Sequence, residues 1–424
     1  MCMKTMKTYP MAALLAAFAL PLTLPFGSVS ASPLISIGDN ADVFFNGSSS
    51  LRSTSNVYRS ENNRKNDQIL ILSPGLELNV GRGASNVDLS LITRYDIVRY
   101  NDQSRLDTEL FHIKAIGSYR SSRLDLNGLI SFDESKTSTG DNAIVDDLIE
   151  FDTFVASLNL EYRFSPKFSF GAGVRYREVD YKTYTEYFAD RETISFPLDL
   201  FYELTPRIDL SVGYTYSETE VDSLVTPLFP GAPLANSVGS YKQKSHFFNV
   251  GARGELMPKL NGSFKVGYRA RSVGDSSTEL VMFPSGVLIP GSEGKRTRSD
   301  SGMLGLEADL RWSATPKLTT TLGLSRDFDV GSEGQSNENT SVNLGASYSI
   351  NSQWAASGNF GYTLRDFSNS GRKDHHYRSG LRLMYSLNQY WNFSGGYTYT
   401  ENDSNRENRS FRDHTFDLTA SLRY

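Results

Sequence analysis

Cysteine is almost missing from this chain of 424 residues, whose single cysteine is Cys2. An exported protein without cysteine pairs needs a source of stability other than disulfide bonds. No stretch approaches the roughly 18 to 20 consecutive apolar residues that a membrane-spanning helix requires. The sequence also lacks Gly-x-Ser-x-Gly, His-Glu-x-x-His and a phosphate-cradling glycine loop. These absences argue against a disulfide scaffold, a helical membrane protein and an enzyme of the common hydrolase or nucleotide-binding classes.

Histidine is scarce as well, and the five histidines are His112, His246, His375, His376 and His414. Adjacent residues of a strand point to opposite faces, so the His375-His376 pair does not converge on one metal ion. We therefore expect no metal site, no cofactor and no catalytic residues.

The first 31 residues have the pattern of a secretory signal peptide. Lys4 and Lys7 form a basic start, residues 11–26 form an apolar segment, and small residues precede a cleavage site near Ala31. Two prolines interrupt the apolar segment, which disfavours the alternative of a helical membrane anchor. We expect an exported protein that begins near residue 32.

The charge balance is mildly acidic, with 43 Lys and Arg against 48 Asp and Glu and a formal net charge of −5. Residues 1–31 hold two lysines and no acid, so the remaining chain carries −7. This acidity argues against nucleic acid as a partner.

The last stretch, residues 411–424, alternates strictly between apolar and polar side chains. One face of the predicted strand carries Phe416, Leu418, Ala420, Leu422 and Tyr424, and the other carries Thr415, Asp417, Thr419, Ser421 and Arg423. Such a period of two indicates a β-strand. A final strand that ends on an aromatic residue is typical of a transmembrane barrel, in which it pairs with the first strand. An edge strand of a soluble sandwich is the alternative.

Short turns recur along the chain at intervals of 36 to 58 residues. The six segments are 164–168 (FSPKF), 204–208 (LTPRI), 256–260 (LMPKL), 314–318 (ATPKL), 350–354 (INSQW) and 387–391 (LNQYW). In four of them proline fixes φ at the first central position of a tight turn. Each interval holds two strands and one longer connection. Short turns at one end and longer loops at the other are characteristic of outer-membrane barrels.

We therefore predict an all-β fold, a transmembrane antiparallel up-and-down β-barrel over residues 41–424, preceded by a short periplasmic segment at 32–40. The alternation gives about 18 strands, with 16 as the fallback, for example 67–80, 244–256 and 376–387. An even number of strands places both termini on the periplasmic side.

A barrel and a sandwich share the same alternation of side chains, so a second feature is needed to tell them apart. The aromatic residues next to the short turns are that feature. Trp312, Trp354, Trp391, Phe164 and Phe168 all lie beside these turns. An aromatic girdle at a membrane interface has this placement. In addition, one open sheet rarely holds so many strands.

A barrel of 16 to 18 strands is too wide for side chains to fill and leaves an aqueous lumen. The inward positions carry charged residues, which are our candidates for ion selectivity: Arg94, Arg175, Arg177, Arg253, Lys265, Arg269, Arg271, Arg311, Arg365, Arg382, Glu255, Glu307 and Asp309. Rings of guanidinium groups would favour anions. The alternative is a charge-compensated wall in which arginines and acids pair.

Two long connections have unusual apolar centres, in residues 225–234 and 281–290. The candidate residues for a constriction or a cap are Leu228, Phe229, Pro230, Met282, Phe283 and Pro284. Apolar loops outside a membrane need cover. They could pack on each other, fold inward or meet a partner.

Residues 181–191 contain Tyr181, Tyr184, Tyr187 and Phe188. These side chains would stack on sugar rings or join the upper aromatic girdle.

The amino-terminal segments Ser55-Asn-Val-Tyr-Arg59 and Asn66-Asp-Gln-Ile-Leu-Ile-Leu-Ser-Pro-Gly-Leu-Glu-Leu78 resemble the opening hairpin of a family of outer-membrane β-barrel porins. Many members are associated with exopolysaccharide production and export. The proline turns at intervals of about 40 residues also look like that family. The resemblance implies passive passage of a polymer or its fragments, and it supplies no catalytic residues.

We thus expect a non-enzymatic conduit, integral to the outer membrane of a Gram-negative-type bacterium, for an anionic exopolysaccharide. A general or solute-selective diffusion porin and a non-conducting structural or adhesive barrel are the alternatives. The expected partners are outer-membrane lipid including lipopolysaccharide, a periplasmic export partner, and the barrel assembly machinery, which would recognise the last strand ending at Tyr424.

Overall fold

The computed structural model describes residues 32–81, 85–138, 147–228, 232–367 and 370–424. These residues are almost entirely β-strand, with one short 3-10 helix, η1 (Ser104–Leu106). Within the same ranges, no helix is long and apolar enough to cross a membrane.

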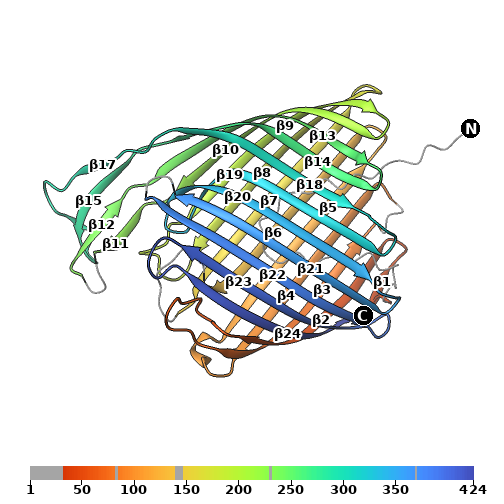
Figure 1. Cartoon of the computed structure of the whole chain (residues 1–424), viewed down its shortest axis with the longest axis horizontal. Helices are drawn as coiled ribbons and strands as arrows, with labels where there is room; N and C mark the ends of the chain where they lie inside the picture. Colours follow the sequence, from red (N-terminus) through yellow and green to blue (C-terminus); the bar gives the residue numbers. More distant parts are fainter. Residues whose placement is uncertain (1–31, 82–84, 139–146, 229–231, 368–369) are drawn as a thin grey trace, which may run out of the picture.

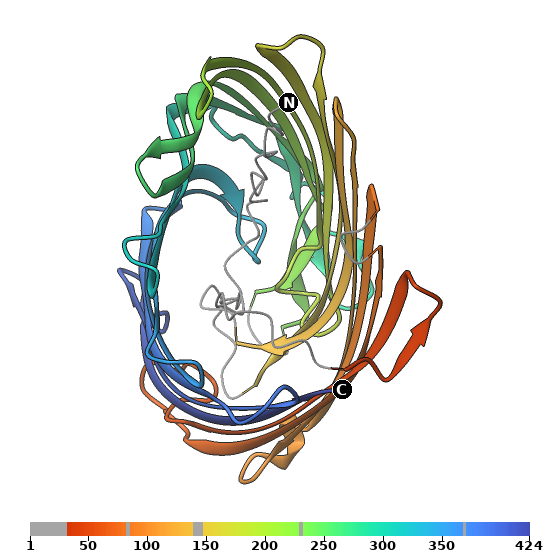
Figure 2. The ribbon, with the colours of Figure 1, turned by 90° about the vertical axis from the view of Figure 1, so that its right-hand side faces the viewer.

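A single antiparallel sheet curls into a barrel (Figure 1), and its cross-section is oval (Figure 2). The sheet has 19 strands in the described chain, of which β1 (Ile35–Ile37) only extends one edge, so eighteen form the wall. They are β2 (Ala41–Thr54), β3 (Asp67–Val80), β4 (Val87–Tyr100), β5 (Thr108–Arg120), β6 (Leu124–Thr137), β7 (Ile149–Arg163), β8 (Phe168–Tyr181), β9 (Arg191–Thr205), β10 (Ile208–Val221), β13 (Tyr241–Met257), β14 (Leu260–Val273), β18 (Ser301–Trp312), β19 (Leu318–Val330), β20 (Ser336–Ser349), β21 (Trp354–Phe367), β22 (Arg372–Ser386), β23 (Trp391–Ser404) and β24 (Phe411–Arg423). The predicted fold class and the count of 18 are confirmed.

The barrel closes between its first and last wall strands. Asn46–Thr54 of β2 pairs with Thr415–Arg423 of β24. The backbone N–H of Phe45 donates to the carbonyl of Tyr424 at 2.6 Å, and the N–H of Tyr424 donates back at 2.9 Å. Closure leaves no unpaired strand edge at membrane depth, where free N–H and C=O groups would have no water to bond.

β1 lies in the segment 32–40, where no strand was predicted. It pairs with residues 41–43 of β2, on the edge that β24 leaves beyond Tyr424. The short strand therefore covers the part of β2 that the last strand does not reach.

Several of the short turns share one hydrogen-bonding pattern. In the turn between β9 and β10, the hydroxyl of Thr205 accepts hydrogen bonds from the backbone N–H groups of Arg207 and Ile208 at 3.3 and 3.1 Å. Thr315 does the same between β18 and β19, as does the side-chain oxygen of Asn388 between β22 and β23. A serine, threonine or asparagine at this position mimics a backbone turn and fixes a tight reversal.

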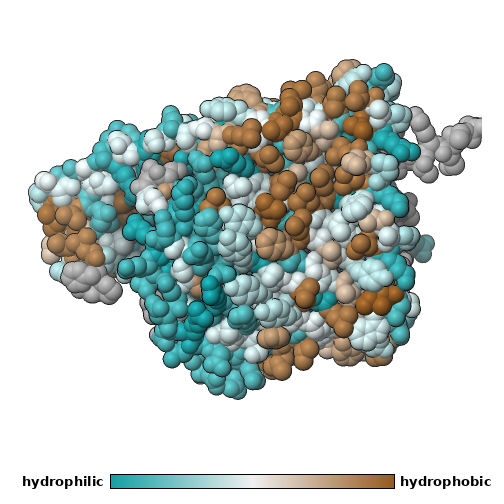
Figure 3. Space-filling view, viewed as in Figure 1, coloured by the Kyte–Doolittle hydropathy of each residue, from teal (hydrophilic) through white to brown (hydrophobic). Residues whose placement is uncertain are grey.

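The outer surface of the barrel is apolar across its middle (Figure 3). Leu381, Leu418 and Val212 are among its most exposed large hydrophobic residues, and Trp312, Trp354 and Trp391 are exposed beside the short turns. This band and its aromatic girdle are what a lipid-facing surface requires. The rim at the end with the long connections is largely polar in the same view, and apolar atoms reappear on the part that projects beyond it.

A second, smaller sheet projects from the end with the long connections, here called the outer end (Figure 1). It consists of β11 (Leu224–Pro227), β12 (Leu234–Val238), β15 (Ser276–Met282), β16 (Val287–Leu288) and β17 (Gly294–Arg296). We call it the projecting sheet.

Candidate lumen and outer mouth

The inner wall carries several of the predicted charged residues as ion pairs. Arg253 on β13 contacts Glu161 of β7 at 2.6 Å and Asp209 of β10 at 3.0 Å. Its guanidinium also lies 3.5 Å from the centre of the Phe201 ring. Lys265 contacts Asp199 at 2.8 Å.

Arg269 is buried, with 4% of its side chain exposed. It contacts Glu307 of β18 at 2.8 Å and Asp327 of β19 at 2.9 Å, and it packs on the Phe247 ring at 4.0 Å. Its neighbour on the same face, Arg271, lies 4.4 Å from the centre of the Phe328 ring. The positive charge of Arg269 is therefore matched by two carboxylates.

The other predicted lumen residues divide into two groups. Arg94 contacts Asp96 at 2.9 Å, Arg382 contacts Asp417 at 3.0 Å, and Glu255 contacts Arg207 at 3.4 Å near a short turn. The remaining inward residues are Arg175 and Arg177 on β8, Asp309 and Arg311 on β18, and Arg365 on β21. Among the described residues, Arg177 and Arg311 have no ion-pair partner, so much of the wall is charge-compensated while some arginines keep an unmatched charge.

Two further inward arginines were not singled out from the sequence. Arg52 on β2 and Arg378 on β22 are exposed to the lumen and lie within electrostatic reach of each other. Neither has an ion-pair partner in the described ranges. Their inward parity was readable from the alternation, but only the structure shows which arginines lack a carboxylate.

The outer mouth is narrowed by residues 327–339, the outer ends of β19 and β20, which we call the inward hairpin. β18 and β19 pair only as far as Leu306 and Arg326, whereas β19 and β20 stay paired up to Val330 and Ser336. Beyond this split the hairpin curves into the space enclosed by the wall (Figure 2). Its apolar face then covers the inner wall instead of facing lipid.

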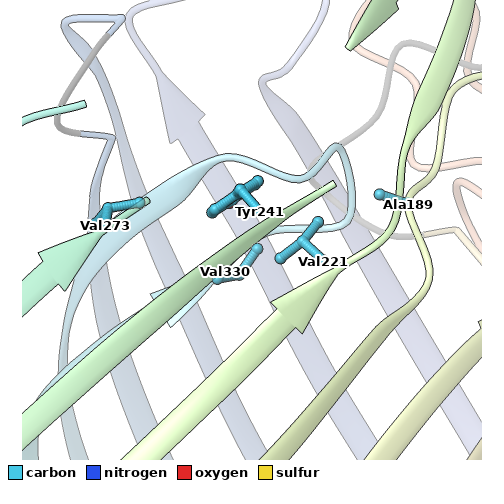
Figure 4. Close-up of a cluster of buried hydrophobic side chains, with 5 residues drawn as sticks. All are labelled: Ala189, Val221, Tyr241, Val273 and Val330. Carbon is cyan, nitrogen blue, oxygen red and sulfur yellow. The ribbon is translucent and has the colours of Figure 1, made fainter. Parts of the chain in front are cut away.

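A buried hydrophobic cluster holds the inward hairpin in place (Figure 4). Val330 packs with Val221, Tyr241 and Val273 from the inner face of β10, β13 and β14, and with Ala189 from the connection between β8 and β9. Burying this apolar area contributes roughly 25 cal/mol per Å².

Hydrogen bonds hold the tip of the hairpin on both sides. The N–H of Ala189 donates to the carbonyl of Ser332 at 3.0 Å, and the hydroxyl of Tyr241 donates to the carbonyl of Gly334 at 2.9 Å. From the connection between β23 and β24, Arg409 reaches Glu333 at 2.6 Å. The hairpin thus links two separate parts of the rim.

The aromatic residues of 181–191 lie in and beside the connection that contacts the inward hairpin through Ala189. Phe188 is only 2% exposed and stacks on Tyr181, with ring centres 5.1 Å apart, and Tyr184 and Tyr187 pack against the same cluster. Tyr181 and Phe188 are buried, so they neither stack on sugars nor face lipid, whereas Tyr184 and Tyr187 are only partly buried and sugar stacking stays a prediction for them. Burial, together with the hydrogen bond that the Tyr184 hydroxyl donates to Asp147 at 2.5 Å, raises the pKa of Tyr184 to about 12.

The amino-terminal motif joins the rim near the barrel's closure. Asp413 of β24 accepts hydrogen bonds from the Thr54 hydroxyl at 2.8 Å and from the backbone N–H groups of Ser55 and Asn56. Asp67 accepts bonds from three successive backbone N–H groups, at residues 101–103. Both carboxylates order connections, so these motif residues have structural roles.

Of the three possibilities for the two apolar segments, the described residues show packing on each other beyond the rim. Leu234–Val238 of β12 pairs with Thr278–Met282 of β15, so the segments pack on each other in the projecting sheet beyond the rim. Leu228, Met282 and Phe283 are exposed there, followed by Pro284, whereas Phe229 and Pro230 lie outside the described residues. The narrowing comes from the inward hairpin, which is tied to the wall by long-range contacts.

Two hollows lie outside the lumen proper. A groove of about 1120 Å³ on the outer wall is lined by outward-facing residues such as Leu322, Ala346 and Leu381, so it belongs to the lipid-facing surface. A polar pocket of about 310 Å³ lies among the outer connections. Across the described ranges, no group of three or more His, Cys, Asp or Glu residues could hold a metal ion.

Comparison with known proteins places this geometry in a family. The family model described as "Putative beta-barrel porin 2" matches residues 46–283 and 295–424. A search of curated proteins finds no match.

Among solved structures, the ferric-catecholate import receptor Fiu from E. coli K12 is 12% identical, covers 93% of this chain and 82% of its own, and has a TM-score of 0.47. OpdK from Pseudomonas aeruginosa with vanillate is 11% identical, with coverages of 90% and 99% and a TM-score of 0.41. OccAB4 from Acinetobacter baumannii is 12% identical, with coverages of 91% and 98% and a TM-score of 0.41.

Proposed function

This chain belongs to the Putative beta-barrel porin 2 family, and we propose that it carries an anionic exopolysaccharide, or short pieces of one, across the outer membrane. The chain is an integral outer-membrane β-barrel of porin type, and such a family points to a channel and not to catalysis. Export and the anionic nature of the cargo are the parts that we propose. Cleavage near Ala31 and a periplasmic export partner belong to the same proposal.

The observation that carries the proposal is the inner wall of an eighteen-stranded barrel. A barrel of this width leaves a water-filled lumen. Arg253, Lys265 and Arg269 are paired with carboxylates, so this part of the wall offers polar contacts without one dominant charge. A polymer can slide along such a wall because no single site holds it tightly.

The preference for an anionic cargo rests on the arginines that lack a carboxylate partner in the described chain. Arg52, Arg177, Arg311 and Arg378 face the lumen from four different strands. A guanidinium group stays charged at any physiological pH and binds carboxylates with two parallel hydrogen bonds. Several such groups along the path favour a polymer with repeated carboxylates.

Conductance of the full chain in planar bilayers tests the proposal. We expect ion conductance that long polygalacturonate blocks at lower concentration than neutral dextran of the same length. Block by small sugars alone would favour a diffusion porin. A silent barrel, tested together with a variant whose inward hairpin is destabilised, would favour a structural or adhesive role.

A further inference from the structure

The polar pocket lies where three outer connections meet. Glu333 and Gln335 come from the connection between β19 and β20, Ser370 precedes β22, and Asn408 and Arg409 come from the connection between β23 and β24. Its volume of about 310 Å³ is at the small end of the range for ligand sites, roughly 300 to 1,000 Å³. This size suits one sugar ring and excludes a folded partner or a long oligomer.

One side of the pocket is rigid and already neutral. Arg372 is buried, and its Nε donates to Oδ1 of Asp374 at 3.0 Å. The hydroxyl of Ser404 donates to the same carboxylate oxygen at 2.6 Å. The charge of Arg372 is therefore matched and is not available to attract a ligand.

Arg409 differs from Arg372 in one respect. Its side chain is 15% exposed and its Nη2 donates to Glu333 at 2.6 Å, but its Nη1 is buried without a hydrogen-bond partner in the described chain. A buried donor left without an acceptor is costly, and more so on a charged group. Because Nη1 is enclosed and Nη2 is held by Glu333, a ligand carboxylate has to displace Glu333, after which it accepts from both nitrogens of the guanidinium group.

We propose that this pocket binds a single acidic sugar unit, whose carboxylate accepts from Nη1 of Arg409. Gln335, Ser370 and Asn408 supply the donors and acceptors that sugar hydroxyls need. An inorganic anion would lack those hydroxyl contacts. Arg406 lines the same pocket as Glu333 and Glu407, so the charges there do not by themselves select between an inorganic anion and a sugar carboxylate. A neutral sugar would leave Nη1 unpaired. The inference rests on the proposed function, because an acidic sugar is one unit of the cargo.

Binding has a consequence for the mouth. The ligand carboxylate and Glu333 compete for one guanidinium group, and Glu333 sits at the tip of the inward hairpin. Occupancy therefore weakens the contact that holds the tip to the connection between β23 and β24. The acidic sugar thus acts at the rim as a signal that loosens the cover.

Calorimetry on the full chain in detergent tests the site, with sodium glucuronate and glucose as probes. We expect glucuronate to bind at least about tenfold more tightly than glucose, and Arg409→Gln to lose about tenfold in glucuronate affinity, as one charge-assisted hydrogen bond requires. Glu333→Gln should bind glucuronate more tightly, because the competing carboxylate is gone. Arg412→Gln, on β24 just after the same connection and exposed in an ion pair with Glu401, is the matched control and should bind as the unmodified chain does.

Equal affinity for the two sugars, or weaker binding by Glu333→Gln, would overturn the site. If Arg409→Gln fails to fold, Arg409→Lys replaces it in the binding measurement. Lysine keeps the charge but cannot offer the paired nitrogens, so this variant should also bind glucuronate more weakly than the unmodified chain. A barrel that conducts but ignores glucuronate refutes this inference and leaves the proposed function standing. A barrel that binds glucuronate but never conducts refutes the proposed function instead.

Discussion

Replacing Arg269 with glutamine separates the structural and the selective roles of the lumen arginines. Arg269 is 4% exposed and contacts both Glu307 and Asp327, so the variant leaves two carboxylates facing each other without a cation. Breaking a fully buried pair typically costs about 3 to 5 kcal/mol. Because Asp327 is half-exposed to lumen water, we expect a loss of about 2 to 3 kcal/mol in the free energy of unfolding.

Urea unfolding in detergent measures this loss, and reversal potentials under a salt gradient measure selectivity. Arg269→Gln should shift the reversal potential towards cation preference, because two negative charges become unmatched. The triple variant Arg269→Gln, Glu307→Gln, Asp327→Asn also removes the two carboxylates. It should restore most of the free energy of unfolding and most of the reversal potential. Arg99→Gln, whose ion pair with Glu109 is exposed, is the control and should change neither. If Arg269→Gln leaves both stability and reversal potential unchanged, the charge-compensated wall is wrong.

Three further predictions concern the mouth and the unmatched arginines. Val330→Asp places a charge in the buried cluster and should enlarge single-channel conductance by releasing the inward hairpin, whereas Leu228→Asp in the projecting sheet should not; equal conductances would contradict the assignment of the cover. Arg52→Gln combined with Arg378→Gln should lower the anion-to-cation permeability ratio with little change in stability, and an unchanged ratio would remove these arginines from the path. The pKa of Tyr184 is raised to about 12, so the stability difference between the unmodified chain and Tyr184→Phe should persist below about pH 10 and vanish as the pH rises through 12. A difference that vanishes before pH 9 would show that this hydrogen bond does not stabilise the cover.

The alternation of side chains predicted the wall because lipid on one side and water on the other impose a period of two. Residues 67–80 were predicted as a strand and form β3 with the same bounds. The prediction of 244–256 missed the start of β13 at Tyr241, and 376–387 missed the start of β22 at Arg372. Both missed segments lie at the outer end, where neither face meets lipid and the period carries no information.

The outer mouth could not be predicted from the sequence for a related reason. Val330 has the parity of a lipid-facing residue, yet it packs on the inner wall because its hairpin separates from β18 and turns inward. Its partners Ala189 and Val221 lie more than 100 residues earlier, and no local pattern records such a contact. The polar pocket has the same origin, since Glu333 and Arg409 are 76 residues apart. The candidate arginines were found by parity, but their pairing depends on the curvature of the wall.

That curvature decides which charges are structural. Arg253 on β13 reaches Glu161 on β7, with β8, β9 and β10 between them in the sheet. Neighbouring strands are about 4.8 Å apart, so four steps along a flat sheet are about 19 Å, farther than the two side chains together can span. The pair exists because the oval wall bends sharply there and brings the two strands together across the lumen (Figure 2).

Lys265 and Asp199 also join strands that are not neighbours, β14 and β9, and so do Arg382 and Asp417 on β22 and β24. The pair of Lys265 and Asp199 crosses three strand spacings, about 14 Å on a flat sheet, so the curvature of the wall brings it together, whereas Arg382 and Asp417 are only two spacings apart, within reach of an arginine. These paired charges stabilise the shape of the barrel, because moving either partner towards a solute would break the contact. Selectivity therefore depends on the arginines outside such pairs, which is why Arg52 and Arg378 are the better substitutions for testing an anionic cargo.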